Sequence, residues 1–124
     1  MNNLLALVLC FTLLCLSLFQ VALIAGKPWG EYAWGGYHKV LTKKLKIASA
    51  FSILIYFFII LIVLNYVGIS SLLGESFADT AMKIITGYFF VGIFLNAISR
   101  SKKERTVMVP ATLILFASSL LLVV

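Results

Sequence analysis

The chain has 124 residues, of which 63% are hydrophobic and only 11% are charged. Soluble domains contain roughly 25% charged residues, so this composition excludes a water-soluble fold with a polar exterior. The formal net charge of +6 comes from basic residues gathered around two connecting segments, which argues against a nucleic-acid-binding surface. We expect lipid to surround most of the side chains, and we expect no nucleic-acid partner.

The first segment, residues 3–25, has no charged side chain and ends before Gly26 and Pro28. At 1.5 Å per residue it is long enough to cross the roughly 30 Å hydrocarbon core of a bilayer. A cleaved signal peptide is the alternative, but no basic region precedes the segment, and its apolar stretch exceeds the usual length of roughly 7–15 residues. We therefore predict a retained transmembrane helix.

The second segment covers residues 42–68, and Thr42 is suited to cap its N-terminus. Lysines stand in its first turn, where the helix dipole disfavours positive charge. Contact with anionic lipid head groups explains them better, because each basic residue near a charged leaflet contributes about 1 kcal/mol of attraction.

The third segment covers residues 80–99, and either Asp79 or Ser76 is expected to cap it. Lys83 lies one turn inside the helix. Because Lys83 follows Asp79 at the i, i+4 spacing, we expect the two side chains to form an ion pair.

The fourth segment covers residues 106–124 and places Pro110 in its first turn, where a missing backbone donor is tolerated. Apolar runs such as residues 53–64 lack the alternation of membrane-barrel strands. Backbone polar groups cannot stay unpaired in hydrocarbon, so the segments must be helices. We predict an all-α fold in which residues 1–124 form a single domain, an integral membrane bundle of four transmembrane helices.

Charge is distributed unevenly between the connections at residues 26–41 and 100–105 and the connection between them. Nine of the ten basic residues lie in or beside the first and third connections: Lys27, Lys39, Lys43, Lys44, Lys46, Arg100, Lys102, Lys103 and Arg105. The second connection carries only Glu75 and Asp79. Because basic loops face the cytoplasm, we expect a multi-pass protein of the cell membrane with both termini outside. Anionic head groups are its expected partners at the cytoplasmic loops.

The reactive side chains form no recognisable catalytic or metal-binding set. Cys10 and Cys15 point about 140° apart on a helix, so we expect two inert packing cysteines and no disulfide. His38 is the only histidine, and only Glu31 accompanies it, so a haem or zinc site would be incomplete. We expect no catalytic residues, no metal and no cofactor.

The segment 26–38 (GKPWGEYAWGGYH) mixes aromatic residues with glycines. One interpretation is an aromatic belt at the membrane interface. Another is a cytoplasmic cup in which Glu31, Trp34 and His38 contact a ligand. The glycines match neither the dinucleotide-binding nor the P-loop pattern.

This segment has the pattern P-W-G-x-x-x-W-G-G-x-H and is followed by a basic, serine-containing entry to the second helix. The residues concerned are Pro28, Trp29, Gly30, Trp34, Gly35, Gly36, His38, Lys46 and Ser49. Over about residues 20–55 the chain resembles small uncharacterised bacterial membrane proteins of four helices. The resemblance supports the membrane interpretation and implies no activity.

Three polar residues lie inside the predicted spans. Gln20 and Asn96 come late in the first and third segments, so we expect them at similar depth, hydrogen-bonded between those helices. Asn65 lies near the outer end of the second helix and is expected to meet the region of Asp79. Interhelical contacts of this kind are more common than a transport path.

The biochemical activity of such a chain is open. A non-enzymatic accessory, regulatory or self-associating membrane component fits best, with a second copy or another membrane protein as partner. The alternative is a small-molecule transporter that acts as an oligomer. An enzyme that uses Glu31 and His38 on a lipid or quinone ranks last, because both groups would have to reach one substrate.

Overall fold

A computed structural model describes all residues from Met1 to Val124, and it is entirely helical. The four long helices are α1 (Asn2–Ile24), α2 (Lys43–Tyr66), α3 (Glu75–Ala97) and α4 (Lys102–Val123). Two short 3₁₀ turns, η1 (Gly30–Tyr32) and η2 (Trp34–Gly36), lie in the first connection. Each long helix is long and apolar enough to cross a membrane, so the predicted four-helix membrane fold is confirmed.

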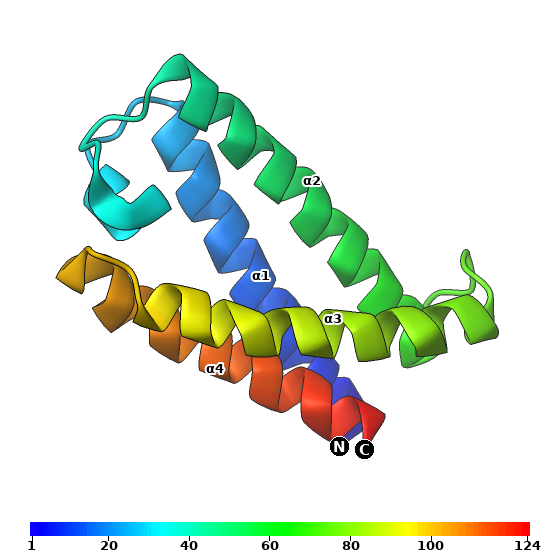
Figure 1. Ribbon diagram of the computed structural model, residues 1–124. Helices are drawn as coiled ribbons and strands as arrows, with labels where there is room; N and C mark the ends of the chain where they lie inside the picture. The colour runs from blue at the N-terminus through cyan, green and yellow to red at the C-terminus, as the bar shows by residue number, and fades with distance from the viewer.

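The helices form two hairpins, α1–α2 and α3–α4, which cross at an angle (Figure 1). Helix α1 also packs against α4, and α2 packs against α3, so each helix has two principal neighbours. The first and third connections lie at one end of the bundle, and η1 and η2 both contact α4 there (Figure 1). The nine clustered basic residues therefore share one end, which we call the basic end. The two termini lie side by side away from it (Figure 1).

The predicted cap of α2 is confirmed, whereas the predicted cap of α3 is wrong. The Thr42 hydroxyl accepts a hydrogen bond from the backbone N–H of Leu45 at 3.3 Å. Helix α3 begins at Glu75, with Gly74 as N-cap and no side-chain cap. The Glu75 carboxylate, in the first turn, favours this earlier start because it complements the positive end of the helix dipole.

The pair Asp79 and Lys83 lies one turn further into α3. Their side chains form the predicted ion pair at 3.4 Å. Because both side chains are more than half exposed at the end of the bundle, the pair contributes little to stability.

Helix α4 also begins earlier than predicted, at Lys102, with Ser101 as its N-cap. The Ser101 hydroxyl accepts from the backbone N–H of Glu104 at 3.2 Å. Ser101 and Glu104 form the Ser-x-x-Glu pattern typical of a helix start, and the predicted start at residue 106 overlooked it. Pro110 consequently lies in the third turn, so its placement in the first turn was wrong.

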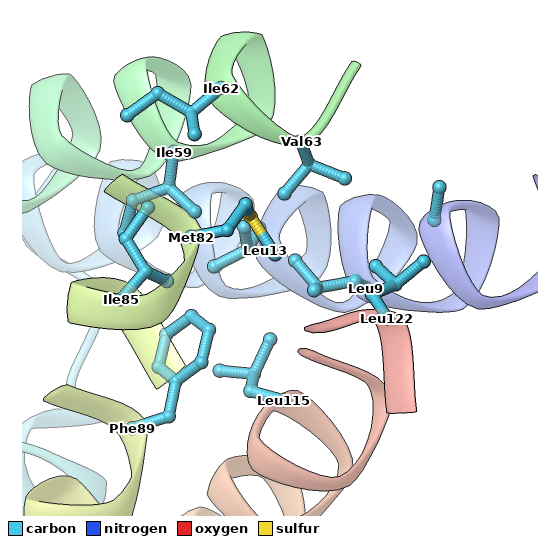
Figure 2. Close-up of a cluster of buried hydrophobic side chains, with 11 residues drawn as sticks. Leu9, Leu13, Ile59, Ile62, Val63, Met82, Ile85, Phe89, Leu115 and Leu122 are labelled. Atoms are coloured by element: carbon cyan, nitrogen blue, oxygen red, sulfur yellow. The ribbon is translucent and has the colours of Figure 1, made fainter. Parts of the chain in front are cut away.

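The main hydrophobic core lies in the half of the bundle remote from the basic end. All four helices contribute to it, as Figure 2 shows: Ala6, Leu9, Leu13, Ile59, Ile62, Val63, Met82, Ile85, Phe89, Leu115 and Leu122. Lipid is as apolar as these side chains, so close packing between helices, rather than exclusion from water, accounts for their stabilising effect. Near the basic end a small second cluster, Leu23, Ala33 and Leu41, packs the first connection against α1.

Candidate ligand-binding cavity

Between the core and the basic end, the four helices surround a cavity of about 460 Å³. Its polar lining residues are Gln20, Ser52, Asn96, Ser99, Glu104 and Thr112. Its aromatic lining residues are Tyr32, Trp34, Tyr56, Tyr88 and Phe89. We call this space the polar cavity. Phe89 and Leu115 belong both to its lining and to the core, so the core forms its floor.

Gln20 lies on α1 and is 7% exposed. Its side-chain oxygen Oε1 is buried and has no hydrogen-bond partner. A buried acceptor without a donor costs about 1–3 kcal/mol, and native proteins contain few such groups. Gln20 Oε1 is therefore an unused acceptor in the lining of the polar cavity, although the Gln20 side chain lies beside the Tyr56 hydroxyl of the same lining.

Asn96 lies on α3, and its amide Nδ2 donates to the Gly92 carbonyl oxygen and to the Thr112 hydroxyl, each at 2.9 Å. The Thr112 hydroxyl in turn donates to the Met108 carbonyl oxygen at 2.6 Å. Both Gln20 and Asn96 line the same cavity, as their equal predicted depth implies. The expected bond between them is absent, because the Asn96 amide is directed to Thr112 on the neighbouring α4.

Glu104 is the one carboxylate in the lining of the polar cavity. It lies in the first turn of α4, is only 8% exposed and accepts a hydrogen bond from the Ser99 hydroxyl. No lysine or arginine pairs with it or lines the cavity. The sequence interpretation missed Glu104 because it assigned this residue to a loop; the Ser-x-x-Glu pattern was the signal that it lies on a helix.

Trp34 covers the cavity from the first connection. Its indole Nε1 donates to the hydroxyl of the fully buried Ser49 on α2, at 3.1 Å. Trp34 has a φ of +51°, a left-handed conformation that is costly for a bulky residue. The strained backbone persists because the surrounding contacts hold the ring in place.

The first connection is attached to the start of α4. The Glu31 carboxylate forms an ion pair with Lys103, and the Ser101 hydroxyl donates to the Glu31 carbonyl oxygen. Arg100 donates to the Gly36 carbonyl oxygen at 3.2 Å. The hydrogen bond and charge of Lys103 lower the pKa of Glu31 below its ordinary value.

Aromatic rings add to this attachment. The Arg100 guanidinium lies 4.1 Å from the centre of the Tyr37 ring, and the Lys103 ammonium lies 5.9 Å from that of Tyr32. At exposed sites a cation–π contact of this kind contributes about 0.5–1 kcal/mol. Tyr32 and Tyr37 thus help to hold the first connection against the start of α4.

Two glycines allow this docking. The Gly30 N–H donates to the Lys39 carbonyl oxygen at 2.8 Å, which brings the two halves of the first connection together. A Cβ at Gly30 would consequently lie 1.9 Å from the His38 carbonyl oxygen. At Gly36, with φ +74°, a Cβ would lie 2.5 Å from that of Ser101. The glycine spacing therefore reflects close backbone approach.

The three residues of the expected ligand cup do not converge. Trp34 lines the polar cavity, but Glu31 and His38 do not. The Glu31 side chain is directed to Lys103, and His38 is exposed. Glu31 contributes to the cavity only indirectly, by holding the connection that carries Trp34.

Asn65 and the cysteines lie away from the polar cavity. The Asn65 Oδ1 accepts from the backbone N–H of Leu73 at 2.8 Å and so stabilises the second connection. Asn65 and Asp79 line one shallow pocket at the end of the bundle opposite the basic end. Cys10 is half-buried and Cys15 exposed, and both are free thiols.

An apolar groove runs beside the polar cavity, between α1 and α4. Its lining residues are Thr12, Cys15, Leu16, Phe19, Trp29, Tyr32, Val107, Met108 and Ala111. Leu16, Tyr32, Met108 and Ala111 also line the polar cavity, so the two spaces share a wall. We call this surface the α1–α4 groove.

The chain brings no three metal-ligating side chains together in a group that could hold a metal ion. Comparison with protein-family models, with curated proteins and with solved structures finds no match to this chain. The observed arrangement is that of a multi-pass membrane protein with a partly polar, aromatic-lined cavity between its four helices.

Proposed function

We propose that this chain is a non-enzymatic accessory or regulatory component of the cell membrane that binds a small amphipathic molecule in the polar cavity. The unpartnered oxygen of Gln20 carries the proposal. A buried acceptor that the fold leaves unused is explained if a bound molecule supplies its donor. The size supports this, because pockets for small molecules are commonly about 300–1,000 Å³.

The lining suits a molecule that is partly apolar. The lining combines aromatic rings with a few polar groups, which is the usual composition of a ligand pocket. The adjoining α1–α4 groove offers such a molecule a route from the lipid, since only a shared wall of Leu16, Tyr32, Met108 and Ala111 separates the spaces. An amphipathic molecule already present in the bilayer would reach the cavity laterally.

The orientation is part of the proposal. The basic end carries nine of the ten basic residues, and basic segments are retained in the cytoplasm. The cavity would then open near the cytoplasmic leaflet and the termini would lie outside. Single cysteines at Lys43 or Lys102, in a chain lacking Cys10 and Cys15, should resist an impermeant thiol reagent in intact cells and react after permeabilisation.

A matched pair of substitutions tests binding. Ala111→Phe adds a ring to the lining of the polar cavity, whereas Ala117→Phe makes the same change at an exposed position of α4. Small molecules that co-purify with the protein from mild-detergent membranes are identified by mass spectrometry. We expect a specific molecule that is lost with Ala111→Phe and retained with Ala117→Phe. A protein that carries no specific molecule, or the same one in both variants, would contradict the proposal.

Transport by an oligomer is the second candidate, favoured by the polar groups Gln20 and Asn96 at one depth of the bundle. The core argues against transport by one chain, because Phe89 and Leu115 close the cavity toward the other end. Flux into proteoliposomes that disappears with Gln20→Leu or Asn96→Leu would favour a transporter. Flux equal to that of empty vesicles would exclude it.

A further inference from the structure

The polar cavity combines a carboxylate without a cation, a buried amide oxygen without a donor, and several aromatic rings. Glu104 is 8% exposed and forms no ion pair, although basic residues surround it in the sequence. Those cations are engaged elsewhere: Lys103 pairs with Glu31, and Arg105 donates to the Ser99 carbonyl oxygen. The lining itself contains no basic side chain.

From this juxtaposition we infer that the ligand of the polar cavity is an organic ammonium with an apolar body, bound through Glu104 and Gln20. This inference rests on the proposed ligand-binding function and adds the chemical class. An ammonium supplies positive charge for the Glu104 carboxylate and an N–H donor for Gln20 Oε1. A carboxylate or phosphate ligand would meet like charge and a second acceptor, so the cavity disfavours it.

The aromatic residues of the lining favour the same class. The faces of Trp and Tyr rings attract cations, and Trp34, Tyr56 and Tyr88 all line the space. Rings also accept the apolar body of the ligand, which a purely charged site would exclude. A hydrated inorganic cation lacks that body, and no cluster of metal-ligating groups is present to hold one.

The competing explanation is that Glu104 serves only the start of α4. It lies in the first turn, where a carboxylate complements the helix dipole, and it accepts from Ser99. That role accounts for neither the unpartnered Gln20 oxygen on a different helix nor the aromatic lining. The two explanations predict different binding behaviour.

The test compares 4-phenylbutylammonium with its neutral analogue 4-phenylbutanol. Calorimetric titrations use the full chain in phosphatidylcholine nanodiscs, with empty nanodiscs subtracted. We expect the ammonium to bind at least about tenfold more tightly than the alcohol, as charge-assisted hydrogen bonds imply. Equal affinities, or tighter binding of the alcohol, would overturn the inference while leaving the proposed function standing. Binding of neither probe would count against both.

Substitutions identify the residues that make the chain prefer the ammonium to the alcohol. Glu104→Gln should reduce ammonium binding to the level of the alcohol, whereas Gln20→Leu should weaken both probes because both donate to Oε1. Glu75→Gln is the matched control: it removes a carboxylate at the opposite end of the bundle, outside the cavity, and it should change either affinity by less than about twofold. Unchanged ammonium binding in Glu104→Gln would overturn the inference. If Glu104→Gln does not fold, two measurements still test the inference: the native chain should bind the ammonium more tightly than the alcohol, and Gln20→Leu should weaken the binding of both.

Discussion

The indole of Trp34 and the hydroxyl of Ser49 form a hydrogen bond of 3.1 Å that joins the first connection to α2. Ser49 is fully buried, and Trp34 adopts a left-handed backbone conformation to reach it. A contact that holds a bulky residue in an unfavourable conformation must be supported by its surroundings. The bond fixes the ring that covers the polar cavity.

Removal of the indole donor should destabilise the fold. Trp34→Phe leaves the Ser49 hydroxyl buried without that donor, so we expect a loss of about 1–3 kcal/mol in the free energy of unfolding, measured by circular dichroism in mixed micelles. Adding Ser49→Ala should recover part of it, because the unpaired group is gone. Trp29→Phe, at a half-exposed ring, is the control. Strictly additive losses would show that the two side chains are not coupled.

Gly30→Ala should open the first connection. The added methyl group would lie 1.9 Å from the His38 carbonyl oxygen, so the bond between Gly30 and Lys39 must break. We expect faster tryptic cleavage after Lys39 in detergent-solubilised protein. Gly87→Ala is the control, because nothing lies within 4 Å of the Cβ position there. Cleavage rates that match in the two variants would show that the close approach does not restrain the loop.

Acid should loosen the attachment of the first connection to α4. The pKa of Glu31 is lowered by Lys103, so the attachment is fully stabilised above the ordinary Glu value of about 4.5 and is lost as the pH falls below it. In a Trp29→Phe chain, the emission of Trp34 should change in this range. Glu31→Gln should abolish the change, and Glu75→Gln at the other end should preserve it. A titration that survives Glu31→Gln would assign the change to another group.

Substitution of Gln20 and substitution of Asn96 should change the free energy of unfolding in opposite directions. Gln20→Leu removes a buried acceptor without a donor and should raise the free energy of unfolding by about 1–3 kcal/mol. Asn96→Leu removes the bond to Thr112 and should lower it by about 1 kcal/mol. Unfolding in sodium dodecyl sulfate mixtures measures both. A destabilised Gln20→Leu variant would mean that the Gln20 oxygen has a partner in the membrane.

Hydropathy and charge were sufficient to predict the four helices and the local contacts at Thr42 and Asp79, because these depend on neighbours within one turn. The docking of Glu31 on Lys103 spans 72 residues and depends on how two hairpins cross, which no local pattern encodes. The same holds for Gln20 and Asn96. Their depth follows from their position along each helix, but their partners depend on helix rotation, which uniformly apolar surfaces leave undetermined.

Glu104 illustrates a second reason why the position of a residue could not be predicted from the sequence. A charged residue near the end of an apolar stretch is normally assigned to water, and the sequence interpretation did so. The cap at Ser101 extends α4 by one turn and carries the carboxylate between the helices. A residue whose burial depends on a single helical turn is difficult to place from hydropathy alone.

Nine basic residues gather at one end, where the only acidic residues are Glu31 and Glu104. This asymmetry determines whether the inserted protein can invert in the bilayer. Inverting the protein would carry every one of these charges through hydrocarbon, and each costs about 2.5 kcal/mol or more at the bilayer centre. Spontaneous inversion is therefore negligibly slow. The basic end therefore faces the same compartment from the insertion of the molecule to its degradation.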